Sequence, residues 1–236
     1  MAEHLSDQEQ IENLKRWWQE NGRQLLLMVV LVLGGWFGWQ QWQDVHQQKA
    51  ADASLVFAEI IDLVQAENIA DLNSEQQERL TTLADSLRGE YSDSQYAQYA
   101  TLALARLAVA RNELDEAAGF LQEVINSASD RELAALTRAR LARVRLAQKQ
   151  YPGVLEVLDV DVETAMRGLY AELRGDAYYH LEDYPAARAA YQLALDNASP
   201  TDPAAYRLLE LKLNRVLEAA APVTVESVDT ESEDAG

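Results

Sequence analysis

The residue types that usually carry catalytic chemistry are scarce or scattered in this sequence. The chain has no cysteine and only three histidines, His4, His46 and His180, none with a second ligand at metal-binding spacing. It lacks both the GxxxxGK loop that cradles phosphate and the GxSxG turn that exposes a serine nucleophile. Its 39 aspartates and glutamates show no recognisable catalytic pairing and are typical of solvated helix faces. We therefore predict a protein that is not an enzyme and has no catalytic residue, cofactor or metal site.

Composition narrows the fold and the partners. The formal net charge of −19 argues against nucleic acid as a partner, because nucleic-acid binding needs a basic surface. Alanine, leucine, glutamate, glutamine and arginine dominate, and all are good helix formers. Five prolines and ten glycines leave little to build the turns of a sheet. We predict an all-α fold.

The most apolar stretch of the chain, LLLMVVLVLGGWFGWQQW, covers residues 25–42. As a helix this stretch would be about 27 Å long, close to the hydrocarbon thickness of a bilayer. Trp36, Trp39 and Trp42 cluster at its C-terminal end, as aromatic residues do at the headgroup level. We predict a single transmembrane helix over residues 25–42, in contact with membrane lipid.

Flanking charges predict the orientation of this helix. Lys15, Arg16 and Arg23 precede it, whereas Lys49 is the one basic residue between positions 43 and 57. The positive-inside bias then leaves residues 1–24 in the cytoplasm and exports the rest of the chain. We interpret the helix as an uncleaved anchor, because no small-x-small cleavage site directly follows the apolar run. A cleaved signal peptide is the alternative.

Two features near the span could make specific contacts. Trp17 and Trp18 lie on the apolar face of an amphipathic segment over residues 1–24. We interpret them as interfacial anchors, and a partner-binding role is the alternative. Gly34 and Gly38 form a GxxxG face that could pack against another membrane helix. The alternative is that glycine is simply frequent in membrane helices.

Three stretches of the later sequence resemble one another. They begin at Leu102, Arg140 and Glu172, and each is predicted to form a helix, a short turn and a second helix. When they are aligned, Leu114, Tyr151 and Tyr184 coincide, at spacings of 37 and 33 residues. Small residues are predicted where the paired helices cross: Ala105, Ala142 and Gly175, opposite Ala117, Val154 and Ala187. A period of about 34 residues with this pattern is typical of tetratricopeptide repeats.

Such repeats stack into an α-solenoid with a concave face. We predict this domain over residues 43–218, ending in a helix that begins near Pro203, and a disordered acidic tail over residues 219–236. The second repeat is irregular, because Arg145 occupies an apolar position and the second helix ends near Asp159.

One face of the first helix in each repeat points away from the packing residues and is a candidate partner-binding groove. An ordinary solvated helix face is the alternative. The candidate residues on this face are Tyr99, Arg106, Arg143, Asp176 and Tyr179.

The order of these segments resembles the YfgM family, the ancillary subunits of the bacterial SecYEG translocon. The strings LKRWWQENGRQ, YATLALARLAVARNELDEAAGFL, RARLARVRLAQKQY, ELRGDAYYHLEDYPAARAAYQLAL and LLELKLNRV carry the resemblance, over roughly residues 8–217. It implies a single-pass inner-membrane protein with a cytoplasmic N-terminus and a periplasmic tetratricopeptide-like domain.

The resemblance also implies partners: the SecYEG translocon, the membrane-anchored periplasmic chaperone PpiD and, as further candidates, soluble periplasmic chaperones. The expected function is that of a non-enzymatic scaffold or chaperone adaptor that helps transfer exported proteins. Two alternatives stay open. One is a regulator that holds a cytoplasmic signalling protein through the N-terminal helix, and the other is a scaffold of another envelope assembly machine.

Overall fold

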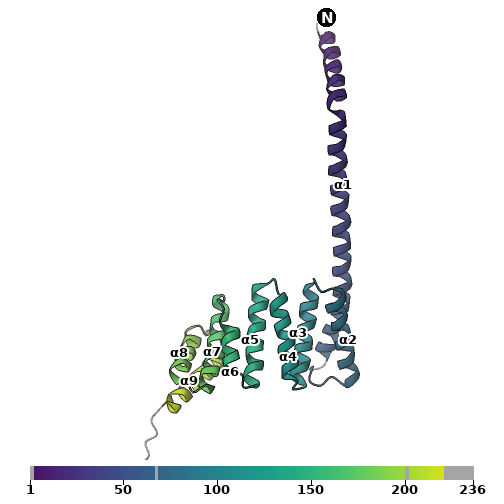
Figure 1. The fold of residues 1–236 in the computed structure, drawn as a ribbon. Helices are drawn as coiled ribbons and strands as arrows, with labels where there is room; N and C mark the ends of the chain where they lie inside the picture. Colours follow the sequence, from purple (N-terminus) through teal and green to yellow (C-terminus); the bar gives the residue numbers. More distant parts are fainter. Residues whose placement is uncertain (1–2, 67–68, 200–201, 221–236) are drawn as a thin grey trace, which may run out of the picture. The chain divides into compact units, whose positions relative to one another are not determined.

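Every element in the described part of the protein is a helix, which confirms the predicted all-α fold class. The computed structural model describes residues 3–66, 69–199 and 202–220. In chain order the helices are α1 (Glu3–Ala66), α2 (Ser74–Glu90), α3 (Gln95–Ala110), α4 (Leu114–Ser127), α5 (Arg131–Ala147), α6 (Tyr151–Leu158), α7 (Thr164–His180), α8 (Tyr184–Asp196) and α9 (Pro203–Ala219) (Figure 1). The predicted acidic tail lies almost wholly outside the described residues.

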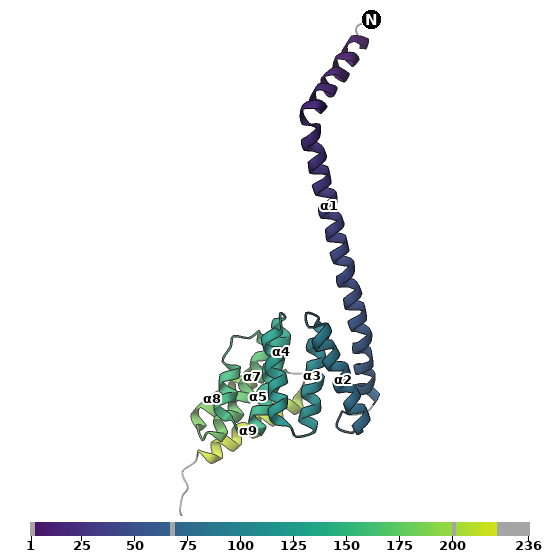
Figure 2. The same ribbon diagram turned by 45° about the vertical axis from the view of Figure 1, so that its right-hand side comes forward.

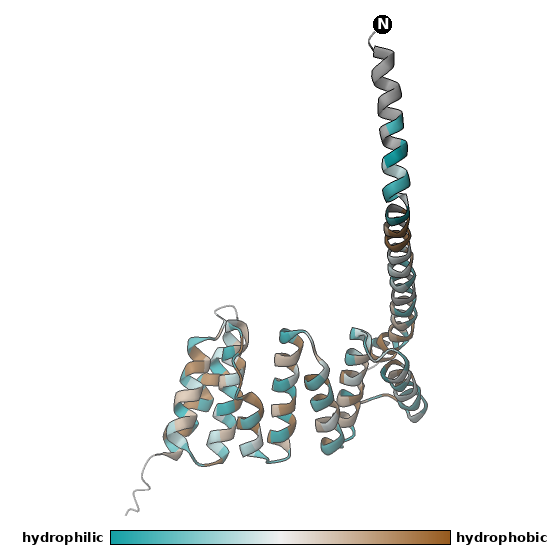
Figure 3. Cartoon of the chain, turned by 45° about the horizontal axis from the view of Figure 1, so that its top comes forward, coloured by the Kyte–Doolittle hydropathy of each residue, from teal (hydrophilic) through white to brown (hydrophobic). Residues whose placement is uncertain are grey.

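The chain divides into two units after Val56, and most of α1 belongs to the first. Among the described residues, α1 is the one helix that is long and apolar enough to cross a membrane. The large apolar side chains described between residues 26 and 42 are 52% to 74% exposed. Along α1, a hydrophilic stretch (teal) is followed by a hydrophobic one (brown) (Figure 3). A helix that is apolar on all sides needs a lipid or protein environment, because water disfavours so much apolar surface.

The glycines of α1 differ in how much space surrounds them. Gly22 is buried under the ring of Trp18, where an added Cβ would lie 3.3 Å from the indole. Figure 2 shows a bend in the N-terminal part of α1. Gly34 and Gly38, by contrast, have no atom within 4 Å of an added Cβ among the described residues. Their face is therefore open, and its contact with another membrane helix stays a prediction.

From α2 onward each helix packs against the next, and α5 also packs against α7. The three helical hairpins share one turn. Asn112, Lys149 and Glu182 have φ of 60° to 62° and stand two residues before α4, α6 and α8. After each of them the next backbone N–H bonds to the carbonyl five residues earlier, at 2.8 to 3.0 Å. This is the Schellman motif, and its recurrence confirms the repeat alignment made on Leu114, Tyr151 and Tyr184.

Small residues allow the paired helices to approach closely. Ala105, Ala142 and Gly175 are all buried, as are the residues aligned opposite them on α4, α6 and α8. Gly175 is the tightest position, because a Cβ there would lie 2.6 Å from the ring of Tyr191. The Tyr170 hydroxyl donates a 2.9 Å hydrogen bond to the Ala135 carbonyl and so ties α7 to α5.

The second repeat is irregular for two physical reasons. Helix α6 has only 8 residues, against 14 in α4 and 13 in α8. Arg145 takes the place of an apolar residue: its guanidinium donates a 2.6 Å hydrogen bond to the Gly153 carbonyl and fills the space that a Cβ at Gly153 would need. The end of α6 is held by Arg174, which donates to the Leu158 carbonyl. Side chains thus replace the missing helical turns.

Helix α9 follows the last repeat, as predicted. The Asp202 carboxylate accepts a 3.0 Å hydrogen bond from the Ala205 N–H and so caps its N-terminus. Leu209 and Val216 are buried in one cluster with Ala187 and Tyr191 of α8. This contact buries the apolar face that the last repeat would otherwise expose.

The shared turn leads to a stability prediction. We expect Glu182→Gly to raise the free energy of unfolding by about 1 kcal/mol, because glycine removes the steric cost of the left-handed conformation. Asn112→Gly should give a smaller gain, since asparagine tolerates that conformation. Urea denaturation of the full chain in detergent, followed by circular dichroism, measures both. Glu182→Ala is the control for loss of charge, and an equal gain in that variant would contradict the conformational explanation.

Candidate binding groove

The candidate site is a hollow of about 580 Å³ in the repeat domain. We call it the arginine groove. Three short segments line it: the last turns of α1 with Ile69, one face of α3 with the start of α4, and one face of α5. The lining residues used below are Phe57, Ile61, Val64, Tyr99, Leu102, Arg106, Val109, Arg140 and Arg143. Its volume lies within the range of about 300 to 1,000 Å³ that is usual for binding pockets.

Helical spacing explains why these residues meet. Tyr99, Leu102, Arg106 and Val109 are three, four and three residues apart, so they share one face of α3. At one end of the groove the Phe57 ring lies 5.9 Å from the Tyr99 ring and 5.4 Å from the Tyr96 ring, measured between centroids. These aromatic contacts hold the end of α1 against α3.

The three arginines give the groove one sign of charge. No ion pair is found for Arg106, Arg140 or Arg143 among the described residues. Burial and then the positive charges of Arg143 and Arg106 lower the pKa of Arg140. Its side chain is still partly exposed to solvent, and arginine keeps its charge in proteins. The arginines therefore lie close enough to repel one another. An apolar surface bordered by unpaired cations can bind an apolar segment that also carries carboxylates.

The structure brings together three of the five predicted groove residues. Tyr99, Arg106 and Arg143 all line the arginine groove. Asp176 and Tyr179 do not: they lie on α7 and contact α9. The Lys212 Nζ lies 2.8 Å from Asp176, and the Arg215 guanidinium lies 4.8 Å from the centre of the Tyr179 ring. The face expected to run through all three repeats is thus covered by the chain itself at the third.

The contact between α9 and α7 is a polar network. Lys212 also donates to Glu172 at 2.7 Å, and the Tyr191 hydroxyl donates to Asp176 at 2.7 Å. Burial alone would lower the pKa of Lys212, but its hydrogen bonds to Asp176 and Glu172 outweigh burial and raise that pKa. Burial and the hydrogen bond to Asp176 raise the pKa of Tyr191 well above its usual value.

Sequence reasoning missed Arg140 and the contribution of α1. Arg140 could have been found, because it stands three residues before Arg143 and shares its helix face. Phe57, Ile61 and Val64 could not, because nothing local to the sequence shows that the end of α1 folds against α3.

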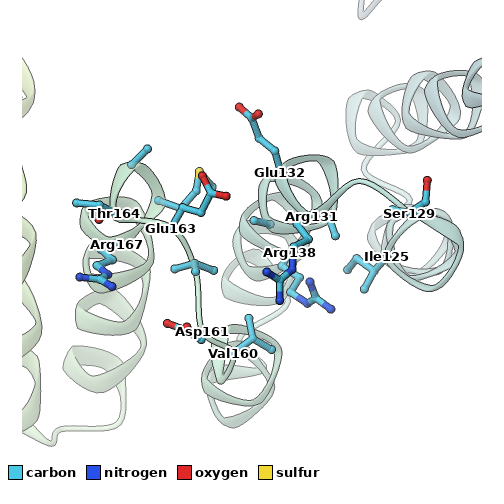
Figure 4. A pocket seen from close by; sticks show the side chains of 16 residues that line it. Ile125, Ser129, Arg131, Glu132, Arg138, Val160, Asp161, Glu163, Thr164 and Arg167 are labelled. Atoms are coloured by element: carbon cyan, nitrogen blue, oxygen red, sulfur yellow. The ribbon is translucent and has the colours of Figure 1, made fainter.

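A second hollow, of about 860 Å³, is lined by the loop that follows α6 and by the helices around that loop (Figure 4). It lies between the end of α4, the first turns of α5, the loop over residues 160–163 and the start of α7. Its lining mixes charges of both signs, among them Arg138, Asp161 and Glu163. It lacks the continuous apolar surface of the arginine groove, so we take the arginine groove as the candidate site. In the part of the chain that the structure describes, no cluster of His, Asp and Glu could hold a metal ion.

Comparison with known proteins identifies the family. A family model described as a tetratricopeptide repeat-like domain matches residues 15–218. A protein of Escherichia coli (strain K12) named "Ancillary SecYEG translocon subunit" is 30% identical over 216 residues, covering 92% of this chain and 99% of that protein. The chain belongs to this family.

Proteins of the same name from two other bacteria are also similar to this chain. The protein from Neisseria gonorrhoeae (strain ATCC 700825 / FA 1090) is 30% identical over 91% of this chain and 99% of its own length. The one from Haemophilus influenzae (strain ATCC 51907 / DSM 11121 / KW20 / Rd) is 25% identical over 92% of this chain and 100% of its own length. No solved structure matches the chain. The resemblance to the ancillary translocon subunits drawn from the sequence is confirmed.

The α9 network of this family member leads to a second stability prediction. We expect Lys212→Met to lower the free energy of unfolding at pH 7 by about 2 kcal/mol, because Asp176 and Glu172 lose the cation between them. Urea denaturation of the full chain measures this change, and Arg207→Met on the exposed face of α9 is the matched control.

The pH dependence of this difference follows from the raised pKa of Lys212. A raised pKa contributes stability that is complete below the unfolded-state pKa, about 10.4, and is lost as the pH rises through the folded-state pKa. The difference between wild type and Lys212→Met should stay constant from pH 7 to about pH 10 and shrink above it. Equal losses in the Lys212 and Arg207 variants would contradict the network.

Proposed function

We propose that this chain is a membrane-anchored, non-enzymatic adaptor that associates with the SecYEG translocon. The observation that carries the proposal is its similarity to proteins named "Ancillary SecYEG translocon subunit" over 99% of their length. A fold of stacked helical hairpins with an apolar groove supports binding as the mode of action.

The apolar part of α1 is the proposed inner-membrane anchor. Its nine leucine, valine and phenylalanine residues favour insertion by about 3 to 5 kcal/mol in total. Lys15, Arg16 and Arg23 favour a cytoplasmic position for residues 1–24 and a periplasmic position for the repeat domain, residues 43–218. Trp17 and Trp18 on one side, and Trp36, Trp39 and Trp42 on the other, would lie at the two interfaces.

The mechanism we propose is positional. The span holds the repeat domain beside the channel, where exported chains emerge. The arginine groove then binds a segment of a periplasmic chaperone, with PpiD and soluble periplasmic chaperones as candidates, or of the emerging chain. Transfer of an exported protein would follow from holding both within reach, which raises their effective concentration without any covalent step.

Topology can be tested directly, because the chain has no cysteine of its own. We expect Ser92→Cys to react with a membrane-impermeant maleimide in intact spheroplasts. Gln19→Cys, on the other side of the span, should react only after the membrane is permeabilised. Mass-shift electrophoresis reads both variants, and the reverse pattern would contradict the proposed orientation.

The partners can be tested by photo-crosslinking in living cells. A photoreactive amino acid at Val109, which is 45% exposed in the arginine groove, should capture a translocon subunit, a periplasmic chaperone or an exported chain. The same amino acid at Leu193, which is 48% exposed on α8, is the matched control and should capture less of each. Mass spectrometry identifies the products. Recovery of no channel subunit, chaperone or exported chain at Val109 would contradict the proposal.

A further inference from the structure

Helix α5 has an unusual charge content for this chain. It carries five arginines, Arg131, Arg138, Arg140, Arg143 and Arg145, against one glutamate, although the chain has 39 acidic and 20 basic residues in all. Arg145 is used internally, on the Gly153 carbonyl. Arg140 and Arg143 instead line the arginine groove, together with Arg106 from α3.

We propose that the arginine groove binds an acidic amphipathic segment of a partner protein, in which carboxylates flank apolar side chains. This inference rests on the proposed function, that the groove binds protein, and adds the chemistry of the bound segment. Its apolar side chains would lie on Leu102, Val109 and the end of α1. Its carboxylates would pair with Arg106, Arg140 and Arg143.

Some cations elsewhere in the repeat domain have carboxylate partners, whereas others, such as Arg138, Arg167 and Arg188, have none among the described residues. Arg88 lies 2.7 Å from Glu123 and 2.9 Å from Asp85, Arg79 lies 2.6 Å from Glu59, and Lys212 lies between Glu172 and Asp176. What distinguishes Arg106, Arg140 and Arg143 is that they line one hollow together, close enough to repel one another, with no ion pair found for any of them among the described residues. The pairing that they lack within the chain can be supplied by a bound segment.

The three arginines border an apolar surface. Val109 is 45% exposed and Tyr99 is 39% exposed, and both line the groove beside Arg106. A purely acidic ligand would leave this surface in water, and a purely apolar one would leave three cations desolvated and unpaired. An amphipathic acidic segment satisfies both at once, and arginine pairs with carboxylates in two-pronged geometry.

The rest of the protein is strongly acidic. A net charge of −19 repels acidic peptides at long range, although salt screens that repulsion beyond about 8 Å at physiological ionic strength. A preference for acidic segments therefore cannot come from the overall charge. It has to come from a local cluster of cations, and so a measured preference would point to the groove.

The test uses the full chain in detergent micelles and two labelled 18-residue peptides. One has leucines at helical spacing with glutamates between them, and the other has lysine in place of every glutamate. Fluorescence anisotropy measures both dissociation constants. We expect the glutamate peptide to bind at least about tenfold more tightly than the lysine peptide, and more weakly as salt rises. Equal binding, or preference for the lysine peptide, would overturn the inference.

Matched variants locate the binding site. The double variant Arg106→Gln, Arg143→Gln should lose about tenfold or more in affinity for the glutamate peptide, since it removes two charge-assisted contacts. Arg188→Gln, at an exposed position on α8, should bind as wild type does. Val109→Ser should also weaken binding, whereas Leu193→Ser should not. An unchanged affinity in the arginine double variant, with its circular dichroism spectrum intact, would overturn the inference.

A truncated chain decides between a partner and the chain's own acidic tail. A chain ending at Ala219 should bind the glutamate peptide as the full chain does. Binding about tenfold tighter after truncation would make the tail the occupant and overturn the inference of a partner segment. Peptide binding without any crosslink to channel, chaperone or exported chain would leave this inference standing and contradict the proposed function.

Discussion

Each hairpin of the repeat domain depends on a close approach between its two helices at a small residue. Ala105, Ala142 and Gly175 occupy this position in the three repeats, and each turn is closed by the same Schellman motif. Because the approach and the turn recur, equivalent residues of successive repeats fall on one face. The groove arises from this constraint: Arg106 and Arg143, 37 residues apart in sequence, line one hollow.

The C-terminal helix gives the ends of this face different roles. At the third repeat, α9 inserts Lys212 between Glu172 and Asp176, so the polar groups there are already bonded. At the first two repeats the corresponding face has arginines without an ion pair among the described residues, and its apolar residues Tyr99 and Val109 are partly exposed. The protein thus stabilises the third repeat with its own last helix, and the proposed binding site lies at the first two repeats.

The hairpins and the small residues at their helix crossings could be predicted from the sequence, because both depend on residue spacing and size within a single repeat. The irregular second repeat was also visible in Arg145, although its bond to the Gly153 carbonyl was not. The covering of Asp176 and Tyr179 by α9, and the place of Phe57 in the groove, depend on contacts between segments far apart in sequence. Such contacts leave no periodic signal in the sequence. The prediction therefore grouped five residues on one face, although only three line the groove and α9 covers the other two.

The central claim is that partners bind at the arginine groove rather than elsewhere on the repeat domain. Hydroxyl-radical footprinting of the full chain, with and without purified SecYEG and PpiD in lipid nanodiscs, tests this most directly. Tyr99 in the groove and Tyr206 on α9 have the same side chain and similar exposure, 39% and 45%. The account predicts that partners slow oxidation of Tyr99 and leave Tyr206 unchanged. Protection of Tyr206 alone, or of neither tyrosine in a complex that has formed, would contradict it.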